Sequence, residues 1–354
     1  MVAEIVSTGS FLPGEPISNE RMEQLVGPLP ADVLEGIQVT QRHWMVDLET
    51  GDHLVNNSQM AVAAAQDALS NAGIDASAVD LIVLSTASPD YLLPPLVTFV
   101  QEALGLERCA TMEVRSGCAG FGEALDVARL YIERGQYETA VVIGSEAISP
   151  LIVPLFLGKD PDKIRMRDRM NPYNFGDGAG AVVVRGGEQG IIGSAMACVG
   201  GAKKPAMQII GAGTHEPVHK QLQAKRLVDL KVDVVESGKF TPYVLTEALT
   251  EVLRATDTRA EDIDVCLIPE GNAGYMVEEL KEAGLLTPEW TALEGKIVEN
   301  LALVGATGSA AVPLALDHAR KTGAVKPGDL VMLLAIETSK WKYAGNVLRW
   351  TAGT

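Results

Sequence analysis

The hydrophobic pattern of the chain alternates between short, wholly apolar runs and longer amphipathic segments. Apolar runs bounded by turn residues occupy residues 81–87, 140–144 and 330–336, as in strands that are buried on both faces of a sheet. Residues 58–72 and 241–255 carry apolar side chains on one stripe, which is typical of helices that cover a sheet. The alternation predicts an α/β protein with buried, mostly parallel sheets.

One order of elements occurs twice along the chain. In each half an amphipathic helix is followed by an aspartate, Asp80 or Asp264, and then by an apolar strand and a turn. This repetition predicts a duplicated α/β unit, and 354 residues suit two packed halves better than one core. We place the join between Val184 and Gly190, which gives an N-terminal half of residues 1–186 and a C-terminal half of residues 187–354.

Two segments lack a clear period of hydrophobic residues. Residues 28–52 are predicted to be irregular. Residues 159–172 are polar and rich in Lys, Arg and Asp, and are predicted to form a surface excursion or a lid.

Charge and cysteine content exclude several classes of function. The net charge of -17 argues against nucleic-acid binding, because a phosphate backbone requires a basic face. No apolar run is long enough to cross a bilayer, and the first residues lack the layout of a signal peptide. The four cysteines have no metal-ligand spacing, so reduced thiols, no metal site and a cytoplasmic location are expected. They are Cys109, Cys118, Cys198 and Cys266.

Cys118 is the main candidate for chemistry. A predicted strand over residues 111–115 meets Ser116 and Gly117, then Cys118, and glycines then lead into a helical pattern. A cysteine at a helix N-terminus lies in the field of unpaired N–H groups, which favours the thiolate. The alternative is a buried core cysteine without chemical function.

Six short stretches, taken in their order along the chain, resemble the β-ketoacyl-acyl-carrier-protein synthase III family of the thiolase fold. The resemblance implies a five-layer αβαβα fold from two duplicated halves, a homodimer, and Cys118 as the residue that accepts an acyl group as a thioester. It also implies an acyl-CoA or acyl-carrier-protein donor and no cofactor beyond the pantetheine-bound acyl group. The stretches are residues 7–13, 87–94, 117–121, 142–146, 175–181 and 348–350.

Two departures from the family pattern concern the second half-reaction, in which the acyl group leaves Cys118 for the acceptor. Where the family has a histidine and an asparagine that donate hydrogen bonds to the malonyl thioester oxygen, this chain has Glu270 and Ala306. An ionised carboxylate only accepts hydrogen bonds and repels a developing enolate. Ordinary decarboxylative condensation is therefore not expected. Glu270 is a candidate general base toward the acceptor, or alternatively a residue that only caps a helix or forms a salt bridge.

Two further departures concern the oxyanion hole and the donor. The family's glycine-rich loop is replaced by residues 336–345, so the backbone N–H of Ser339, paired with that of Cys118, is the candidate oxyanion hole. Lys340 and Lys342 are expected in solvent; pointing inward, they would offset the charge of Glu270 or Glu337. Residues 32–39 lack the aromatic residue and arginine that clamp coenzyme A, which makes a carrier-protein donor at least as suitable.

The remaining ionisable residues are weaker candidates. The basic run of residues 163–169 is the best site for an acidic carrier protein or a pyrophosphate, or else a solvated lid. None of the five histidines is favoured as catalytic: His43, His53, His215, His219 and His318.

The leading hypothesis is an acyltransferase of specialised metabolism that passes an acyl group from Cys118 to a hydroxyl, amine or acidic carbon of a small-molecule acceptor. The alternatives are a carbon–carbon (Claisen-type) condensation rebuilt around Glu270, and a non-catalytic partner subunit of an active homologue.

Overall fold

The computed structural model describes residues 1–211, 213–215, 217–223, 228–269 and 273–353. In this part of the chain it contains two five-stranded sheets and two short two-stranded ones. The first large sheet has the order β1-β7-β6-β4-β5 and the second β8-β14-β13-β11-β12. The bounds in the first sheet are β1 Val2–Phe11, β4 Leu81–Ser85, β5 Ala110–Val114, β6 Thr139–Glu146 and β7 Gly178–Gly187. Those in the second are β8 Ile191–Cys198, β11 Val265–Leu267, β12 Ile297–Val298, β13 Leu330–Glu337 and β14 Lys342–Arg349.

The two large sheets repeat one topology. In each, the first strand in chain order lies at one edge beside the last, and the middle strands pair in parallel. The chain leaves the first sheet at Gly187 and enters the second at Ile191. The duplication that the sequence predicts is therefore present at the level of strand order.

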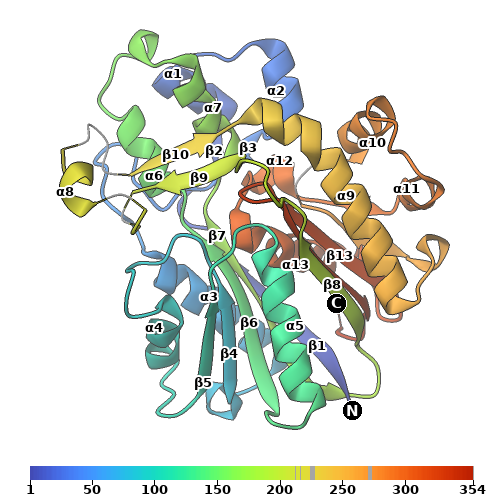
Figure 1. Cartoon of the computed structure of the whole chain (residues 1–354). Helices are drawn as coiled ribbons and strands as arrows, with labels where there is room; N and C mark the ends of the chain where they lie inside the picture. The colour runs from blue at the N-terminus through green and yellow to red at the C-terminus, as the bar shows by residue number, and fades with distance from the viewer. Residues whose placement is uncertain (212, 216, 224–227, 270–272, 354) are drawn as a thin grey trace.

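Helices form three layers around the sheets (Figure 1). The middle layer is α5 (Gly120–Glu133) with α13 (Ala311–Thr322), and both helices pack against strands of both sheets. Helices α3 (Asn57–Ala72) and α4 (Leu96–Ala103) cover the outer face of the first sheet, and α9 (Val234–Thr256) covers that of the second. This arrangement confirms the predicted five-layer αβαβα fold.

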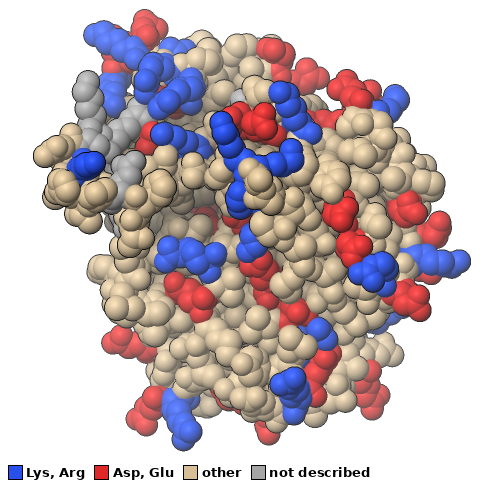
Figure 2. All heavy atoms as spheres, viewed as in Figure 1, with Lys and Arg blue, Asp and Glu red and all other residues tan. Residues whose placement is uncertain are grey.

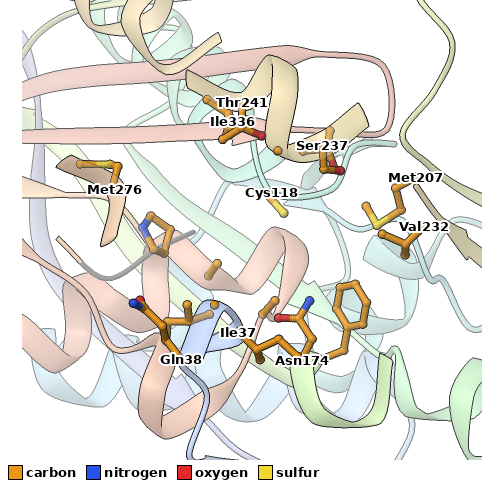
Figure 3. Close-up of a pocket in the computed structure, with 18 of the residues that line it drawn as sticks. Ile37, Gln38, Cys118, Asn174, Met207, Val232, Ser237, Thr241, Met276 and Ile336 are labelled. Atoms are coloured by element: carbon orange, nitrogen blue, oxygen red, sulfur yellow. The ribbon is translucent and has the colours of Figure 1, made fainter. Parts of the chain in front are cut away.

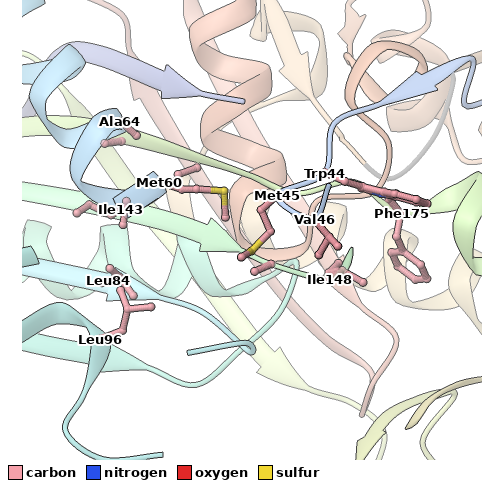
Figure 4. Close-up of a cluster of buried hydrophobic side chains, with 14 of the residues drawn as sticks. Trp44, Met45, Val46, Met60, Ala64, Leu84, Leu96, Ile143, Ile148 and Phe175 are labelled. Atoms are coloured by element: carbon pink, nitrogen blue, oxygen red, sulfur yellow. The ribbon is translucent and has the colours of Figure 1, made fainter. Parts of the chain in front are cut away.

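The buried apolar side chains fall into three clusters that follow these layers. The cluster between the sheets includes Phe121 and Leu316 from the middle helices. The cluster outside the first sheet includes Met60, Ile143 and Trp44 (Figure 4). The third lies between α9 and the second sheet. Because β4 and β6 are buried on both faces, they have the continuous apolar runs from which the sequence predicts them.

Smaller elements form a cap above one end of the sheets (Figure 1). Residues 28–52 were predicted to be irregular, and this is wrong in part, because they contain α2 (Ala31–Ile37) and β3 (Gln41–Arg42). The polar segment of residues 159–172 likewise contains most of α7, Met166–Asn174. The other small elements are β2 Ile17–Ser18, α1 Asn19–Val26, α6 Ser149–Ile152, α8 Val218–Gln221, β9 Met207–Ile210, β10 Asp229–Val232, α10 Ala273–Glu282, α11 Pro288–Leu293 and α12 Leu301–Val304.

The segment that replaces the family's glycine-rich loop is mostly strand. β13 extends to Glu337 and β14 begins at Lys342, and these two residues face each other in the ladder. Only residues 338–341 lie between the strands, and Trp341 takes a left-handed backbone with φ 62°. The second edge of β14 pairs with β8, so this segment is held on both sides. A loop over residues 336–345 is therefore not what the chain forms.

Within the described part of the chain, no helix has the length and apolar character that crossing a bilayer requires.

Candidate active site

Cys118 lies in the turn that joins a buried sheet to the middle helix layer. β5 ends at Val114 and α5 begins at Gly120, two residues after the cysteine. The Cys118 side chain is half-buried and is not part of a disulfide. A Cβ atom at Gly120 would lie 1.9 Å from the Ser85 hydroxyl oxygen, so only glycine lets the helix start this close to β4. The turn that the sequence predicts around Cys118 is therefore present.

A cavity of about 380 Å³ opens at Cys118. Figure 3 shows the sulfur near the centre, with Ser237, Thr241 and Ile336 on one side and Ile37, Gln38 and Asn174 on the other. Most of the described lining is apolar, and its side chains come from both halves of the chain. The size and the apolar walls are those of a small-molecule site with one reactive group.

One of the two positions that depart from the family pattern lines this cavity. Ala306 lines it, and so does Pro269, the residue before Glu270. Glu270 itself lies outside the described residues, so its role as a base stays a prediction. Ala306 brings only a methyl group to a position where the family has an amide donor. Asn174, at the end of α7, is an amide in the lining that sequence reasoning missed.

Glu337 lies directly behind the turn of residues 115–119, the candidate nucleophile turn that carries Cys118. Sequence reasoning did not find this contact. Its carboxylate accepts a hydrogen bond from the Gly117 N–H at 2.7 Å and one from the Ser116 hydroxyl at 2.8 Å. The Ser339 hydroxyl donates to the same carboxylate. The Ser339 backbone N–H as an oxyanion donor stays a prediction.

The side chains of Lys340 and Lys342, which follow β13, have different surroundings. Lys342 points inward, where it donates to the Ser116 hydroxyl at 3.0 Å and forms an ion pair with Glu123 at 2.5 Å. Lys340 instead donates to the carbonyl oxygens of Gly201 and Lys203 at the surface. One lysine therefore brings positive charge next to the turn that holds Cys118.

A second turn, from the C-terminal half, meets the nucleophile turn. The Ser309 hydroxyl donates to the Ser116 carbonyl at 2.7 Å and lies 3.1 Å from the Gly117 carbonyl. The Ser309 N–H donates to Glu146 at 3.1 Å. Burial raises the pKa of Glu146, although hydrogen bonds from Ser88 and from backbone N–H groups act in the opposite direction.

An outer cavity of about 420 Å³ adjoins the first, and the two share the lining residues Met170, Asn171 and Val232. It is more polar, and Arg167 and Lys231 line it. Figure 2 shows Lys and Arg side chains gathered on the upper part of this face, around α7 and β10. Asp168 and Asp233 line the outer cavity as well, and Arg167 lies 3.4 Å from Asp168. The outer cavity therefore presents side chains of both charges.

Only part of the basic run of residues 163–169 is available to a ligand. Arg165 is held by Asp168 at 2.8 Å, although the arginine side chain is 61% exposed. Arg169 donates to the carbonyl oxygens of Ile164 and Pro161, which makes it a structural residue. Arg167 is the member of the run that lines the outer cavity.

The remaining cysteines and histidines lie away from this chemistry. Burial raises the pKa of Cys266 to about 12 and that of Cys109 to about 11, so both remain thiols at neutral pH. None of the five histidines lines either cavity. Among the residues that the structure describes, no group of three His, Cys, Asp or Glu side chains is arranged to hold a metal ion.

Comparison with known proteins identifies the family to which the chain belongs. Residues 112–200 match the family model of 3-oxoacyl-[acyl-carrier-protein] synthase III, and residues 253–350 match the model of its C-terminal part. A β-ketoacyl-[acyl-carrier-protein] synthase III of Caldanaerobacter subterraneus is 30% identical over 353 residues, which cover 99% of this chain and 98% of the relative. The chain belongs to the synthase III family. A Rhodospirillum rubrum member is 32% identical and covers 94% of both chains.

Solved structures of synthase III proteins have the same fold over the whole chain. The 3-oxoacyl-[acyl-carrier-protein] synthase III of Aquifex aeolicus has a TM-score of 0.79 at 25% identity, covering 98% of this chain and 100% of the other. AbyA1, described as a tetronic acid condensing enzyme, has a TM-score of 0.83 at 27% identity, covering 98% of this chain and 99% of its own. The fold of this chain is therefore shared by a protein described as a condensing enzyme as well as by proteins named synthase III.

Proposed function

We propose that this synthase III-family protein is an acyltransferase that takes an acyl group onto Cys118 and passes it to a small-molecule acceptor. The observation that carries the proposal is the half-buried thiol at the start of α5, open to an apolar cavity of about 380 Å³. A cysteine in this position is suited to be a nucleophile.

In the first half-reaction the Cys118 thiolate attacks the carbonyl carbon of a CoA or carrier-protein thioester. A tetrahedral oxyanion forms and is stabilised by backbone N–H groups, of which that of Cys118 is the first candidate. The carbon–sulfur bond to the pantetheine breaks, and the pantetheine leaves as a thiolate that then takes a proton from solvent, which replaces the one that Cys118 had released. The product is an S-acyl cysteine.

The outer cavity supports a pantetheine-bound donor. A donor that reaches Cys118 from this side passes between Met170 and Val232, and its phosphate then lies near Arg167 and Lys231. Positive side chains at that point favour a phosphate or an acidic carrier protein. The donor is therefore an acyl-CoA or an acyl carrier protein.

Ala306 offers no amide donor for an enolate, so the second half-reaction that we propose is one that needs no enolate. A hydroxyl, an amine or an already acidic carbon needs only a base. Glu270 is one candidate. Glu279 is a second, because it is the charged side chain in the described lining of the inner cavity. Burial raises the pKa of Glu279, although a hydrogen bond from Tyr275 opposes the shift, and a raised pKa makes a carboxylate a better base.

The runner-up is a carbon–carbon condensation in which the base deprotonates the acceptor without decarboxylation. Likeness to AbyA1, a condensing enzyme by description, favours it. A homodimer and a place in specialised metabolism remain part of the proposal. A non-catalytic partner subunit is the outcome if no donor acylates Cys118.

Intact-mass spectrometry after incubation with acyl-CoA and acyl-carrier donors tests the first step. We expect an adduct of the acyl mass that is absent in Cys118→Ala; a protein that gives no adduct with any donor is not an acyltransferase. Glu270→Gln and Glu279→Gln then identify the base: the variant that acylates but does not turn over has lost it. Rapid carbon dioxide release from malonyl thioesters would contradict the argument from Ala306.

A further inference from the structure

The peptide group between Ser116 and Gly117 is held at both of its polar ends. Its carbonyl oxygen accepts a hydrogen bond from the Ser309 hydroxyl at 2.7 Å. Its N–H donates to Glu337 at 2.7 Å. In a trans peptide these two groups point in opposite directions, so the two partners hold the plane from its two sides. Both Ser309 and Glu337 come from the C-terminal half and are buried.

The next peptide group, between Gly117 and Cys118, is fixed through its carbonyl. That oxygen accepts the Gly120 N–H at 2.8 Å, and the Ser309 hydroxyl lies 3.1 Å away. The Cys118 N–H therefore points to the side opposite Gly120 and Ser309. A rotation of the Ser116–Gly117 plane would turn this N–H as well, because the two peptide groups meet at the Gly117 Cα.

Glu337 acts on this turn and not on a substrate. Its neighbours in sequence, Ile336 and Thr338, both line the inner cavity, whereas Glu337 is absent from the lining. Successive side chains of a strand point to opposite faces, so the Glu337 carboxylate lies on the far side of β13 from the cavity, against Gly117.

We propose that Glu337 and Ser309 are positioning residues, which clamp the Ser116–Gly117 peptide so that the Cys118 N–H is directed at the thioester oxyanion. This inference rests on the proposed function, since it concerns the first half-reaction at Cys118. The charged groups around the clamp are Glu337 itself, Lys342 from β14, Glu123 from α5 and Glu146 from β6, which accepts the Ser309 N–H. The positive charge of Lys342 offsets the negative charge of Glu123, with which it forms an ion pair.

Two reactions of the same thiol separate positioning from a general loss of structure. Acylation by an acyl thioester requires both a thiolate and an oxyanion donor, whereas alkylation by iodoacetamide requires only the thiolate. Both are measured in a Cys198→Ser background, because the Cys198 side chain is exposed. Cys109 and Cys266 interfere little, since burial raises the pKa of these thiols to about 11 and about 12.

We expect Glu337→Ala to slow acylation of Cys118 at saturating donor by at least about tenfold, because misdirecting one oxyanion donor has a large effect. Alkylation at pH 7 should not fall, since removing a nearby negative charge favours the thiolate. Glu337→Gln keeps an acceptor for the Gly117 N–H and should acylate within about threefold of the unaltered chain. Ser309→Ala releases the other end of the peptide and should also lower acylation relative to alkylation.

The matched control is Glu138→Ala, which removes an exposed glutamate just before β6. It should change neither reaction. Parallel losses of acylation and alkylation in Glu337→Ala, or equal losses of acylation in Glu337→Gln and Glu337→Ala, would overturn the inference. So would unchanged acylation in Ser309→Ala, which also decides the matter if Glu337→Ala does not fold. Failure of the unaltered chain to form any adduct is a different result, and it rejects the proposed function itself.

Discussion

Two turns that lead into the two middle-layer helices, α5 and α13, meet at the centre of the molecule, and each is supported by a glutamate from the other half. The turn before α5 carries Cys118 and rests on Glu337, the last residue of β13. The turn before α13 carries Ser309 and rests on Glu146, the last residue of β6. β6 and β13 are both eight residues long and hold equivalent places in the two sheets.

The difference between the turns shows how a duplicated scaffold came to hold one reactive site. Glu146 accepts hydrogen bonds from Thr86, Ser88 and two backbone N–H groups, and the Ser309 side chain is fully buried. Glu337 lies beside Lys342, and its turn exposes a thiol to the inner cavity. The turn at Ser309 is therefore built for support and the turn at Cys118 for chemistry.

Moving the thiol to the other turn should not move the activity. Cys118→Ala should remove the acyl adduct completely, and adding Ser309→Cys should not restore it, because position 309 is buried against backbone carbonyls. Intact mass after donor incubation measures both variants. An adduct in the double variant would mean that the two turns are chemically equivalent, contrary to the comparison.

The glycines of the two turns should differ in their tolerance of a side chain. A Cβ at Gly308 would lie 2.6 Å from a Glu146 carboxylate oxygen, and φ there is +53°. We expect Gly308→Ala to lower the free energy of unfolding by about 2 kcal/mol. At Gly117 the nearest atom is Cδ of Glu337 at 3.3 Å, so Gly117→Ala should cost about half as much. Urea unfolding gives the order, and a reversed order would contradict the tighter support of the second turn.

Removing the hydroxyl that links the turns should cost less. Ser309→Ala takes a donor from two backbone carbonyls, those of Ser116 and Gly117, although Gly117 keeps its bond from Gly120. We expect a loss of about 1–2 kcal/mol in the free energy of unfolding. Thermal or urea unfolding measures it, with Glu138→Ala as the control. A variant as stable as the unaltered chain would show that the two turns pack without needing this bond.

The smallest effect should be a pH dependence from Glu146. Because burial raises its pKa in the folded state, the folded protein binds the proton more tightly than the unfolded chain does. The stability that this proton contributes is present below the unfolded pKa, about 4.3, and is lost as pH rises toward the folded pKa. Glu146→Gln cannot ionise, so its stability relative to the unaltered chain should improve as the pH is raised from 5 to 8. A difference that is constant over this range would contradict the raised pKa.

The sequence predicts those parts of the structure that depend on residues close together in the chain. β4, β6 and β13 are mainly apolar, as expected of strands that are buried on both faces, and the turn at Cys118 follows from its glycines. The helix α9 begins at Val234, before the predicted start, since the Asp233 side chain accepts the Glu236 N–H and Pro242 is tolerated inside the helix. The sequence offered no periodic pattern for α2, whose last residue Ile37 lines the inner cavity.

The support of the nucleophile turn could not be predicted, because its cause is not local. Gly117 and Glu337 are 220 positions apart in the chain, and their contact depends on how the two sheets face each other. A single glutamate at the end of an apolar strand looks like an exposed strand terminus. Only the three-dimensional arrangement shows that its carboxylate meets a backbone N–H next to Cys118. The family resemblance points to Cys118, but not to Glu337 and Ser309, which contact the turn that carries it.

The contact between Gly117 and Glu337 also has a consequence for biosynthesis. A ribosome makes the strand, turn and helix around Cys118 long before it makes the β13–β14 hairpin, and N-terminal segments begin to fold first. The hydrogen bonds that complete the nucleophile turn come from Ser309 and Glu337, in the last part of the chain. A nascent or truncated chain therefore holds the thiol without its finished surroundings. Under the proposed function, acylation of Cys118 begins only when the C-terminal hairpin has been synthesised and docked.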